Sequence, residues 1–470
     1  MSDVVAFLSG SSNGLRLSLV RVLLKMMFAR CAHVGCSDNG AARRFERSTC
    51  FCVLRHWVKG EALVRNRNVT IYQETDFPEE ADLLTQLKAL PELLEEILSA
   101  TGKELGLQER LRERHHPALV RAAFILLDGR EKAKSQLLHG EQLWVTPVAL
   151  QQSTSWAVAQ YKAKRFPGGI NILDICSGIG VDAAALLARG PVTSVDIDPA
   201  MSLRCLWNNQ IWSSETNPSG FQHEVQTTDA AQIDVSGRII HADPDRRVGR
   251  DRPTTRLEQY CPNLDWMHKA IRSAAGGAIK LGPASNFMQK FPGCEIELIS
   301  LNGECREATV WFGELAGEND FRATLLPSGE TISVPSLSAY CPLSEEVQQY
   351  IFDPDPAIVR SGMLEAVGEM HNLQRLDKAD EYLTAGSIPE TSFVTAFQVD
   401  AVLGNNPREL NRYLRTEPSR DYEIKCRHLS VDAAAVHKKL PRGDGPPRVL
   451  LFIRLNGKAK IVVARRIQNA

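Results

Sequence analysis

The sequence predicts an α/β protein in which a Rossmann-like, mostly parallel sheet lies between a helical module and a small α+β module. Three observations support this fold class. Apolar runs alternate with helical segments from 171 to about 315, as in parallel sheets with helices on both faces. Residues 77–167 repeat apolar side chains at helical spacing. The end of the chain reads as strand, helix and a hairpin that turns at Asn456–Gly457.

Four predicted segments follow from these changes of pattern. Residues 1–76 show neither a helical nor a strand period, and we expect a poorly ordered or spurious N-terminal extension there. Residues 77–167 are a predicted helical module, which we call the leader. Residues 168–390 are the predicted Rossmann-like domain with a β-rich extension. Residues 391–470 are the predicted α+β module, which we call the tail module.

Two stretches predict the type of a single element. Thr146 is a typical N-cap, and Pro147 suits the first helical position because its missing N–H is not needed there. The stretch TPVALQQSTSWAVAQYKAKRF then predicts one continuous helix. In contrast, TSFVTAFQVDAVL predicts a strand followed by a helix.

The formal net charge of −1 conceals an uneven distribution. Residues 1–75 carry a net charge of +6 and residues 401–470 a net charge of +9, whereas 76–400 carry −16. A basic module attached to an acidic body fits a polyanionic partner. It fits equally a basic domain that docks on its own acidic body. No apolar run reaches the length of a membrane span, so we expect no membrane partner.

The eleven cysteines are scattered and form no disulfide pattern, which predicts a reducing, cytoplasmic compartment. Cys261 and Cys305 lack the surroundings of an activated thiol, so covalent catalysis by cysteine is not expected. One cysteine and histidine group near the N-terminus lacks the spacing of paired zinc ligands, so no metal site is expected. This group consists of Cys31, His33, Cys36, Cys50, Cys52 and His56.

The stretch NILDICSGIGVDAAALLARGPVTSVDID (171–198) predicts a ligand site at the carboxyl ends of two strands. The first strand ends near Asp174. Gly178 and Gly180 then let the backbone turn tightly and approach a ligand. Gly178, Gly180 and Ala183 also satisfy the pattern G-x-G-x-x-A of dinucleotide sites, so an NAD-dependent oxidoreductase is an alternative. Asp174 argues against it, because a carboxylate repels a pyrophosphate but attracts an ammonium and a sulfonium, both present in S-adenosylmethionine (SAM).

Further carboxylates complete the predicted cofactor site. The second strand ends at Asp196 and Asp198, and Asp196 is placed to accept hydrogen bonds from ribose hydroxyls. Asp229 follows the third strand region, where it is placed to meet the adenine amino group. Asp182 lies in the first turn of the helix after the glycines, where a carboxylate is also common as a simple helix-terminus residue.

Several motifs resemble class I SAM-dependent methyltransferases that carry a C-terminal THUMP-like domain. They are DICSGIGVDAAAL, VDIDP, HADPDRR, KLGP, ELISLNGECREATVWFG and ATLLPSG, and the tail NNPRELNRYLRTEPSRDYEIKCRHL resembles the THUMP-like domain itself. The resemblance runs from about 110 to 460. It implies a Rossmann-like methyltransferase sheet, SAM as cofactor and a link to RNA. Cys176 stands where many such enzymes have a glycine. The stretch DPDRR departs from the acid-Pro-Pro-aromatic motif of amino-group methyltransferases, which argues against an exocyclic base nitrogen as acceptor.

The fourth predicted strand ends at Asp243, which we expect beside the transferred methyl group. Its carboxylate, or the carbonyl of Pro244, can accept a hydrogen bond from a substrate N–H. Lys280 ends the next strand and either orients the acceptor or neutralises Asp243. Glu304 and Glu307 are expected in a solvated turn.

Basic residues supply the predicted substrate contacts. Arg246 and Arg247 can hold a phosphate in fork geometry or pair with the acidic body. Tyr413 and Tyr422 can stack on unpaired bases, although aromatic residues are more often part of a core. The tail module offers phosphate contacts from Arg408, Arg412, Arg415, Lys425, Arg427, Lys438, Lys439 and Arg442.

Together these residues predict a SAM-dependent methyltransferase that acts on RNA, tRNA or rRNA, with the basic tail module holding the nucleic acid. The alternatives are a non-catalytic RNA-binding protein that keeps a SAM pocket and, as above, an NAD-dependent oxidoreductase. The sequence does not predict the methylated atom or the oligomeric state.

Overall fold

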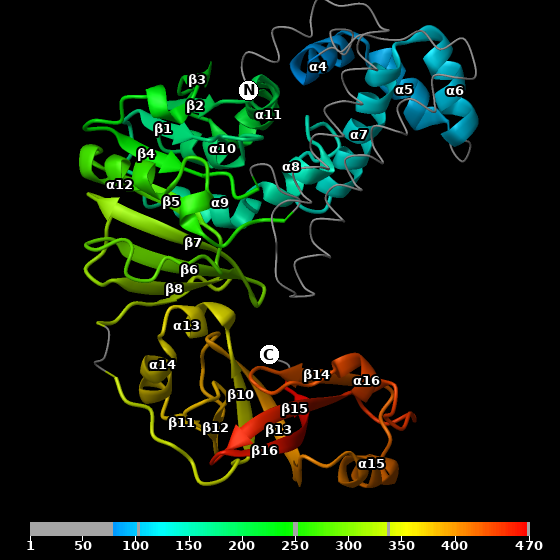
Figure 1. The fold of residues 1–470 in the computed structure, drawn as a ribbon, viewed down its shortest axis with the longest axis vertical. Coiled ribbons are helices and arrows are strands. Elements are labelled where there is room, and N and C mark those ends of the chain that lie inside the picture. Colours follow the sequence, from blue (N-terminus) through cyan, green and yellow to red (C-terminus); the bar gives the residue numbers. More distant parts are fainter. Residues whose placement is uncertain (1–78, 101–103, 248–251, 336–338, 468–470) are drawn as a thin grey trace, which may run out of the picture. The chain divides into compact units, whose positions relative to one another are not determined.

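The computed structural model describes residues 79–100, 104–247, 252–335 and 339–467 (Figure 1). The chain divides after Phe77, and every described element belongs to the second unit, Pro78–Ala470. The predictions for 1–76, including the cysteine and histidine group there, lie outside the described residues. No helix in the described ranges combines the length and apolar character needed to cross a membrane.

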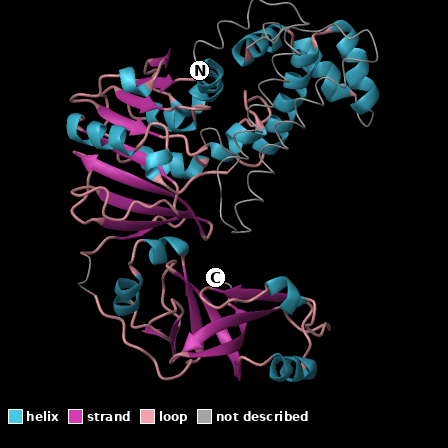
Figure 2. Cartoon of the chain, in the orientation of Figure 1, coloured by secondary structure: helices cyan, strands magenta, loops and turns pink. Residues whose placement is uncertain are grey.

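The leader is helical, as predicted (Figure 2). Thr146 caps α8 by accepting a hydrogen bond from the Ala149 N–H, and Pro147 occupies the first helical position. The helix predicted to continue from there is instead broken at 153–155, where the Ser153 hydroxyl donates to the Leu150 carbonyl and competes with helical bonding. The leader helices are α4 Glu80–Ala89, α5 Pro91–Ser99, α6 Glu104–Arg114, α7 Pro117–Ala133, α8 Pro147–Gln152 and α9 Trp156–Ala163.

Leucines of α4 to α7 form one apolar cluster that includes Trp144 and, from the following domain, Trp207. Asn208, the residue after Trp207, holds Trp144 against this cluster. Its side chain accepts a hydrogen bond from the Trp144 N–H at 2.7 Å and donates to the Trp144 carbonyl at 3.2 Å and to the Ile179 carbonyl at 3.0 Å. The Asn208 side chain therefore links the leader to the loop that follows the first strand of the main sheet.

The main sheet has the order β3-β2-β1-β4-β5-β7-β6-β8-β9. The strands β3, β2, β1, β4 and β5 are parallel, and β7 is inserted antiparallel between β5 and β6. This arrangement confirms the predicted Rossmann-like sheet. Its strands are β1 Ile172–Ile175, β2 Val192–Asp196, β3 His223–Thr227, β4 Ile239–Ala242, β5 Gly276–Leu281, β6 Glu295–Leu301, β7 Glu304–Gly313, β8 Phe321–Leu326 and β9 Glu330–Ile332. Its helices are α10 Val181–Leu187, α11 Pro199–Thr216 and α12 Leu264–Ser273, with 3-10 turns η2 Ala230–Gln232 and η3 Leu257–Gln259.

A second sheet has the order β11-β12-β10-β13-β16-β15-β14. It starts at β10, so the boundary predicted at 390/391 falls between two strands of one sheet. Its strands are β10 Tyr350–Pro354, β11 Gln374–Arg375, β12 Leu383–Ala385, β13 Val394–Gly404, β14 Tyr422–Cys426, β15 Arg448–Leu455 and β16 Lys458–Arg466. The helices of this region are α13 Pro356–Arg360, α14 Leu364–Met370, α15 Pro407–Thr416 and α16 Ala433–His437.

Two details of the second sheet test single predictions. The β15–β16 hairpin turns at Asn456 and Gly457, as predicted, and both residues have positive φ, as a two-residue hairpin turn requires. The helix predicted at the end of TSFVTAFQVDAVL is wrong. These residues lie in β13, because pairing with β10 on one side and β16 on the other outweighs the local helical pattern.

Candidate active site

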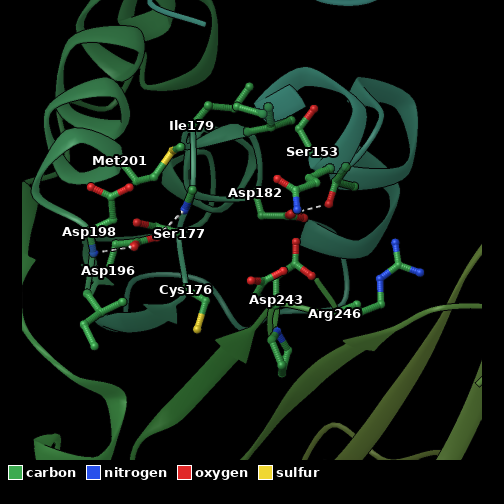
Figure 3. A pocket seen from close by; sticks show the side chains of 18 of the residues that line it. Ser153, Cys176, Ser177, Ile179, Asp182, Asp196, Asp198, Met201, Asp243 and Arg246 are labelled. Atoms are coloured by element: carbon green, nitrogen blue, oxygen red, sulfur yellow. Dashed lines mark hydrogen bonds between the residues drawn. The ribbon is translucent and has the colours of Figure 1, made fainter. Parts of the chain in front are cut away.

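A cavity of about 490 Å³ opens at the carboxyl ends of β1, β2 and β4. This volume lies within the range of small-molecule sites. Figure 3 shows Asp196 and Asp198 on one side of the glycine loop. Asp182, Asp243 and Arg246 lie on the other side of it (Figure 3). The cavity is therefore rich in carboxylates over most of its length and has arginine at one end.

The loop after β1 has a backbone that favours glycine. Cys176, Gly178 and Gly180 all have positive φ, of 60°, 54° and 87°. A Cβ on Gly180 would lie 2.4 Å from the Asn209 side-chain nitrogen, so only glycine fits there. A Cβ on Gly178 would meet nothing within 4 Å, so this backbone is open to a ligand. Cys176 lines the cavity and adopts the left-handed conformation despite its side chain.

Asp196 joins the two loops that form one end of the cavity. Its Oδ2 accepts a hydrogen bond from the Gly178 N–H at 2.9 Å, and its Oδ1 accepts one from the Asp198 N–H at 3.0 Å. Burial raises the pKa of this carboxyl group, although both N–H donors oppose the shift. Asp198 caps α11 through the Ala200 N–H and also lines the cavity. Both residues thus line the cavity after β2, and the ribose contact predicted for Asp196 stays a prediction.

Asp174 lies beneath the cavity rather than on its surface. Its side chain is 1% exposed, and its Oδ1 accepts a hydrogen bond from His241 Nδ1 at 2.8 Å. Its Oδ2 has no hydrogen-bond partner among the described residues, and burial raises the pKa of the carboxyl group. Asp174 is thus not a lining residue of the cavity, and the contact predicted between its carboxylate and a cationic ligand stays a prediction.

Asp243 and Pro244 line the cavity where β4 ends. Lys280 Nζ donates to Asp243 Oδ2 at 2.7 Å and to the Gln152 carbonyl at 3.4 Å. Of the two roles predicted for Lys280, this geometry favours neutralisation of Asp243. Asp243 Oδ1 makes no hydrogen bond to another described residue, so it can accept one from a bound molecule.

Two arginines form the positively charged end of the cavity. Arg246 and Arg247 line this end, and neither forms an ion pair with a described residue. Asp245 also lines it and accepts the Arg247 backbone N–H. None of the described lining residues is aromatic. Such an end can bind an anionic group but offers no aromatic face for stacking a planar base.

The leader contributes to the cavity wall, which the sequence did not indicate. Ala149, Gln152, Ser153 and Thr154 line the cavity, because the break between α8 and α9 places these residues beside the glycine loop. The hydroxyl of Thr154 donates to Asp182, which also lines the cavity. The only available signal was the run of serine and threonine at 153–155, a composition that competes with helix formation.

The remaining predicted site residues lie outside the cavity. Asp229 is exposed and caps η2 through the Ala231 N–H. Lys425 pairs with Asp353 at 2.9 Å, and Arg427 pairs with the same carboxylate at 2.7 Å. These two predicted phosphate contacts are therefore engaged in ion pairs within the protein.

In contrast, Arg408, Arg412 and Arg415 of α15 are exposed and form no ion pair with a described residue. Their spacing places the three guanidinium groups along one stripe of the helix. Tyr422 is buried, and its hydroxyl donates to the Pro441 carbonyl, so it belongs to the core and not to a stacking surface.

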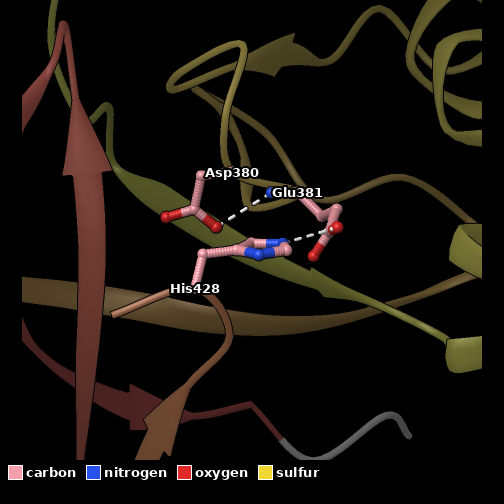
Figure 4. Close-up of side chains that lie close together, drawn as sticks. All are labelled: Asp380, Glu381 and His428. Carbon is pink, nitrogen blue, oxygen red and sulfur yellow. Dashed lines mark hydrogen bonds and ion pairs between the residues drawn. The ribbon is translucent and has the colours of Figure 1, made fainter. Parts of the chain in front are cut away.

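Asp380, Glu381 and His428 also lie close together (Figure 4). The two oxygens of Asp380 accept backbone N–H groups of Glu381 and Arg454. Glu381 pairs with His428 at 2.6 Å and with Arg427 at 3.4 Å. The polar groups of this cluster are thus already bonded to one another and to the backbone.

Comparison with known proteins finds relatives over most of this chain. Two uncharacterized S-adenosylmethionine-dependent methyltransferases of Mycobacterium tuberculosis, from strains CDC 1551 / Oshkosh and ATCC 25618 / H37Rv, are each 31% identical to it over 323 residues. The alignment covers 66% of this chain and 85% of each relative. The THUMP domain-like family matches residues 394–466. A crystal structure from Porphyromonas gingivalis W83, provisionally assigned as a methyltransferase, has a TM-score of 0.65 at 15% identity and covers 85% of this chain and 100% of its own.

Proposed function

Because the chain belongs to the S-adenosylmethionine-dependent methyltransferases, we propose that it methylates an RNA that its basic tail module holds. When bound, the cofactor would supply an electrophilic methyl group: the acceptor would bond to the methyl carbon in line with the breaking C–S bond, and S-adenosylhomocysteine would leave as a neutral thioether. The observation that carries the proposal is the charge of the cavity: carboxylates lie along most of it, and one end has two arginines without an ion-pair partner in the described part of the chain. A cationic cofactor and an anionic acceptor match these two parts.

The cavity residues fit the cofactor. The backbone at Gly178 is open to a ligand, and Asp196 and Asp198 provide acceptors for ribose hydroxyls beside it. Asp182 and Asp243 add negative charge farther along the wall. A pyrophosphate would meet these carboxylates without a cation at the glycine loop, so the oxidoreductase alternative has no support here.

At the acceptor end, Asp243 Oδ1 and the Pro244 carbonyl are available to orient a substrate N–H. Lys280 holds the other oxygen of Asp243 at 2.7 Å and so limits its rotation. Arg246 and Arg247 are suited to a phosphate, since guanidinium groups bind phosphate in fork geometry. The absence of an aromatic among the described lining residues supports an acceptor that is not a stacked exocyclic amine.

The RNA part of the proposal rests on the tail module. The stripe of Arg408, Arg412 and Arg415 offers three exposed cations that form no ion pair with any residue that the structure describes. Phosphate contacts of this kind give affinity with little sequence preference. The match to the THUMP domain-like family at 394–466, together with the link to RNA implied by the resemblance, supports the same region as the RNA-binding part.

The test is transfer of a radioactive methyl group from SAM to total RNA and, in parallel, to total protein, followed by mass analysis of nucleosides. We expect label in RNA that disappears after ribonuclease treatment and with the Asp243→Asn variant. Label in protein alone would refute the RNA substrate. Binding of SAM without label in either pool would favour the non-catalytic alternative.

A further inference from the structure

A lysine of the leader is buried behind the part of the cavity wall that Asp182 forms. Lys162 of α9 is 1% exposed. Its Nζ lies 3.0 Å from Asp182 Oδ1, 3.0 Å from Glu307 Oε1 and 3.3 Å from His241 Nε2. These partners come from α10, β7 and β4, so one ammonium group joins three elements of the main domain. Glu307, which we expected in a solvated turn, is 2% exposed here.

This group has an unbalanced charge. Lys162 carries one positive charge between two carboxylates, so the three residues together carry a net charge of −1. Only Asp182 of the two carboxylates faces the cavity, where its side chain is 11% exposed (Figure 3). The uncompensated negative charge is therefore presented to a bound ligand.

A buried lysine without anionic partners would lose its proton, and a buried carboxylate without a cation would gain one. Here the ion pairs oppose the effect of burial on both pKa values. The pKa of Lys162 lies above its usual value, and the pKa of Asp182 lies below it, because each stabilises the charge of the other. Asp182 is also fixed by the Thr154 hydroxyl on its second oxygen.

The network continues to the predicted cofactor residue Asp174. His241 lies between Lys162 and Asp174. Its Nε2 contacts Lys162 Nζ, and its Nδ1 lies 2.8 Å from Asp174 Oδ1. Because an ammonium can only donate, Nε2 of His241 is the acceptor in this contact, which leaves Nδ1 to donate to Asp174. Lys162 thus directs the N–H of His241 towards Asp174. The other charged pair nearby, Asp243 with Lys280, is balanced by itself.

We propose that Lys162 is a positioning residue for the cofactor. It holds Asp182 ionised at the cavity wall and orients His241 on Asp174, so that a net negative charge faces the ammonium and sulfonium of SAM. The leader thereby supplies part of the cofactor site, although Lys162 itself does not line the cavity. The inference depends on the cofactor and not on the RNA proposal, so the two fail independently.

The test is calorimetric binding of three ligands between pH 6 and pH 9. SAM carries both cationic groups, S-adenosylhomocysteine only the ammonium, and 5′-methylthioadenosine neither. Lys162→Met leaves two carboxylates buried together and is expected to lower the melting temperature strongly. The double variant Lys162→Met with Glu307→Gln removes this repulsion and should recover much of that loss.

In the double variant we expect SAM affinity to fall at least tenfold at pH 7, S-adenosylhomocysteine affinity to fall less, and 5′-methylthioadenosine to stay within twofold. The affinity for SAM should recover as the pH rises, because Asp182 then loses the proton that it gains without Lys162. Lys132→Met, which removes an exposed ion pair with Asp128, is the matched control and should leave all three affinities unchanged. Equal loss for the three ligands, or full SAM affinity in the folded double variant, would overturn the proposal.

Discussion

Replacement of Asp196 by alanine tests how the cofactor end of the cavity is held together. The carboxylate bonds the loop after β1 to the loop after β2 through the N–H groups of Gly178 and Asp198, at 2.9 and 3.0 Å. Alanine removes both bonds and the acceptors that we propose for the ribose. The change therefore affects the free protein and the complex through the same two oxygens.

The two effects have different sizes. A hydrogen bond to a charged group contributes about 1.5 kcal/mol or more, so two such bonds give about 3 kcal/mol. Water reaches this partly exposed site and replaces part of the lost hydrogen bonding. The free energy of unfolding should therefore fall by about 1–2 kcal/mol. Cofactor binding loses at least one further charged bond, about 1.4 kcal/mol or more, which corresponds to a tenfold or greater rise in Kd.

Calorimetric titration with SAM and urea unfolding measure the two quantities separately. Asp196→Asn keeps one acceptor oxygen and should give an intermediate Kd. Asp234→Ala removes an exposed carboxylate that caps only a surface turn and should leave the Kd unchanged. If Asp196→Ala binds SAM as tightly as the unaltered protein, the assignment of this carboxylate to the ribose is wrong.

Three further predictions address other parts of the chain. Burial lowers the pKa of His223 to about 4, so between pH 6.5 and 4 the unfolded chain binds a proton that the folded chain does not. The free energy of unfolding should fall by up to about 3 kcal/mol as the pH drops through this window. Urea unfolding of His223→Gln should not show this loss. Cys261 is exposed and lines the cavity. Saturating SAM should therefore slow alkylation of its thiol by iodoacetamide. An unchanged rate would contradict binding of the cofactor in this cavity. Replacing Arg412 and Arg415 by glutamine should weaken RNA binding several-fold and reduce its salt dependence in filter-binding assays. Lys425→Gln should instead lower stability with little effect on RNA binding. If Lys425→Gln weakens RNA binding more than the arginine changes do, the α15 surface is refuted as the RNA-binding part.

The parts of the fold that depend on local chemistry were predictable from the sequence. Gly178 and Gly180 indicate a turn with positive φ, which side chains disfavour, and Asn456–Gly457 indicates a two-residue hairpin; both signals act within a few residues. The charge pattern also indicated a basic tail module, because net charge does not depend on the fold.

The errors concern residues whose partners are distant in the sequence. Glu307 follows a turn and was expected in solvent, but it is buried because Lys162 meets it from another element. Lys425 and Arg427 looked like free cations, but Asp353 of β10 pairs with both, although β10 and β14 are not adjacent in the order of the sheet. Sequence spacing cannot reveal such pairs, since it does not show which strands become neighbours.

The bonding of Asn208 to Trp144 has a practical consequence for anyone who wishes to excise the catalytic sheet. A shortened polypeptide beginning at 168 would leave the Trp207 ring uncovered and deprive Asn208 of two of its three backbone partners. Expression trials on a shortened enzyme should therefore retain at least the leader helices α4 to α9, and failure of a version without them would say nothing about catalysis.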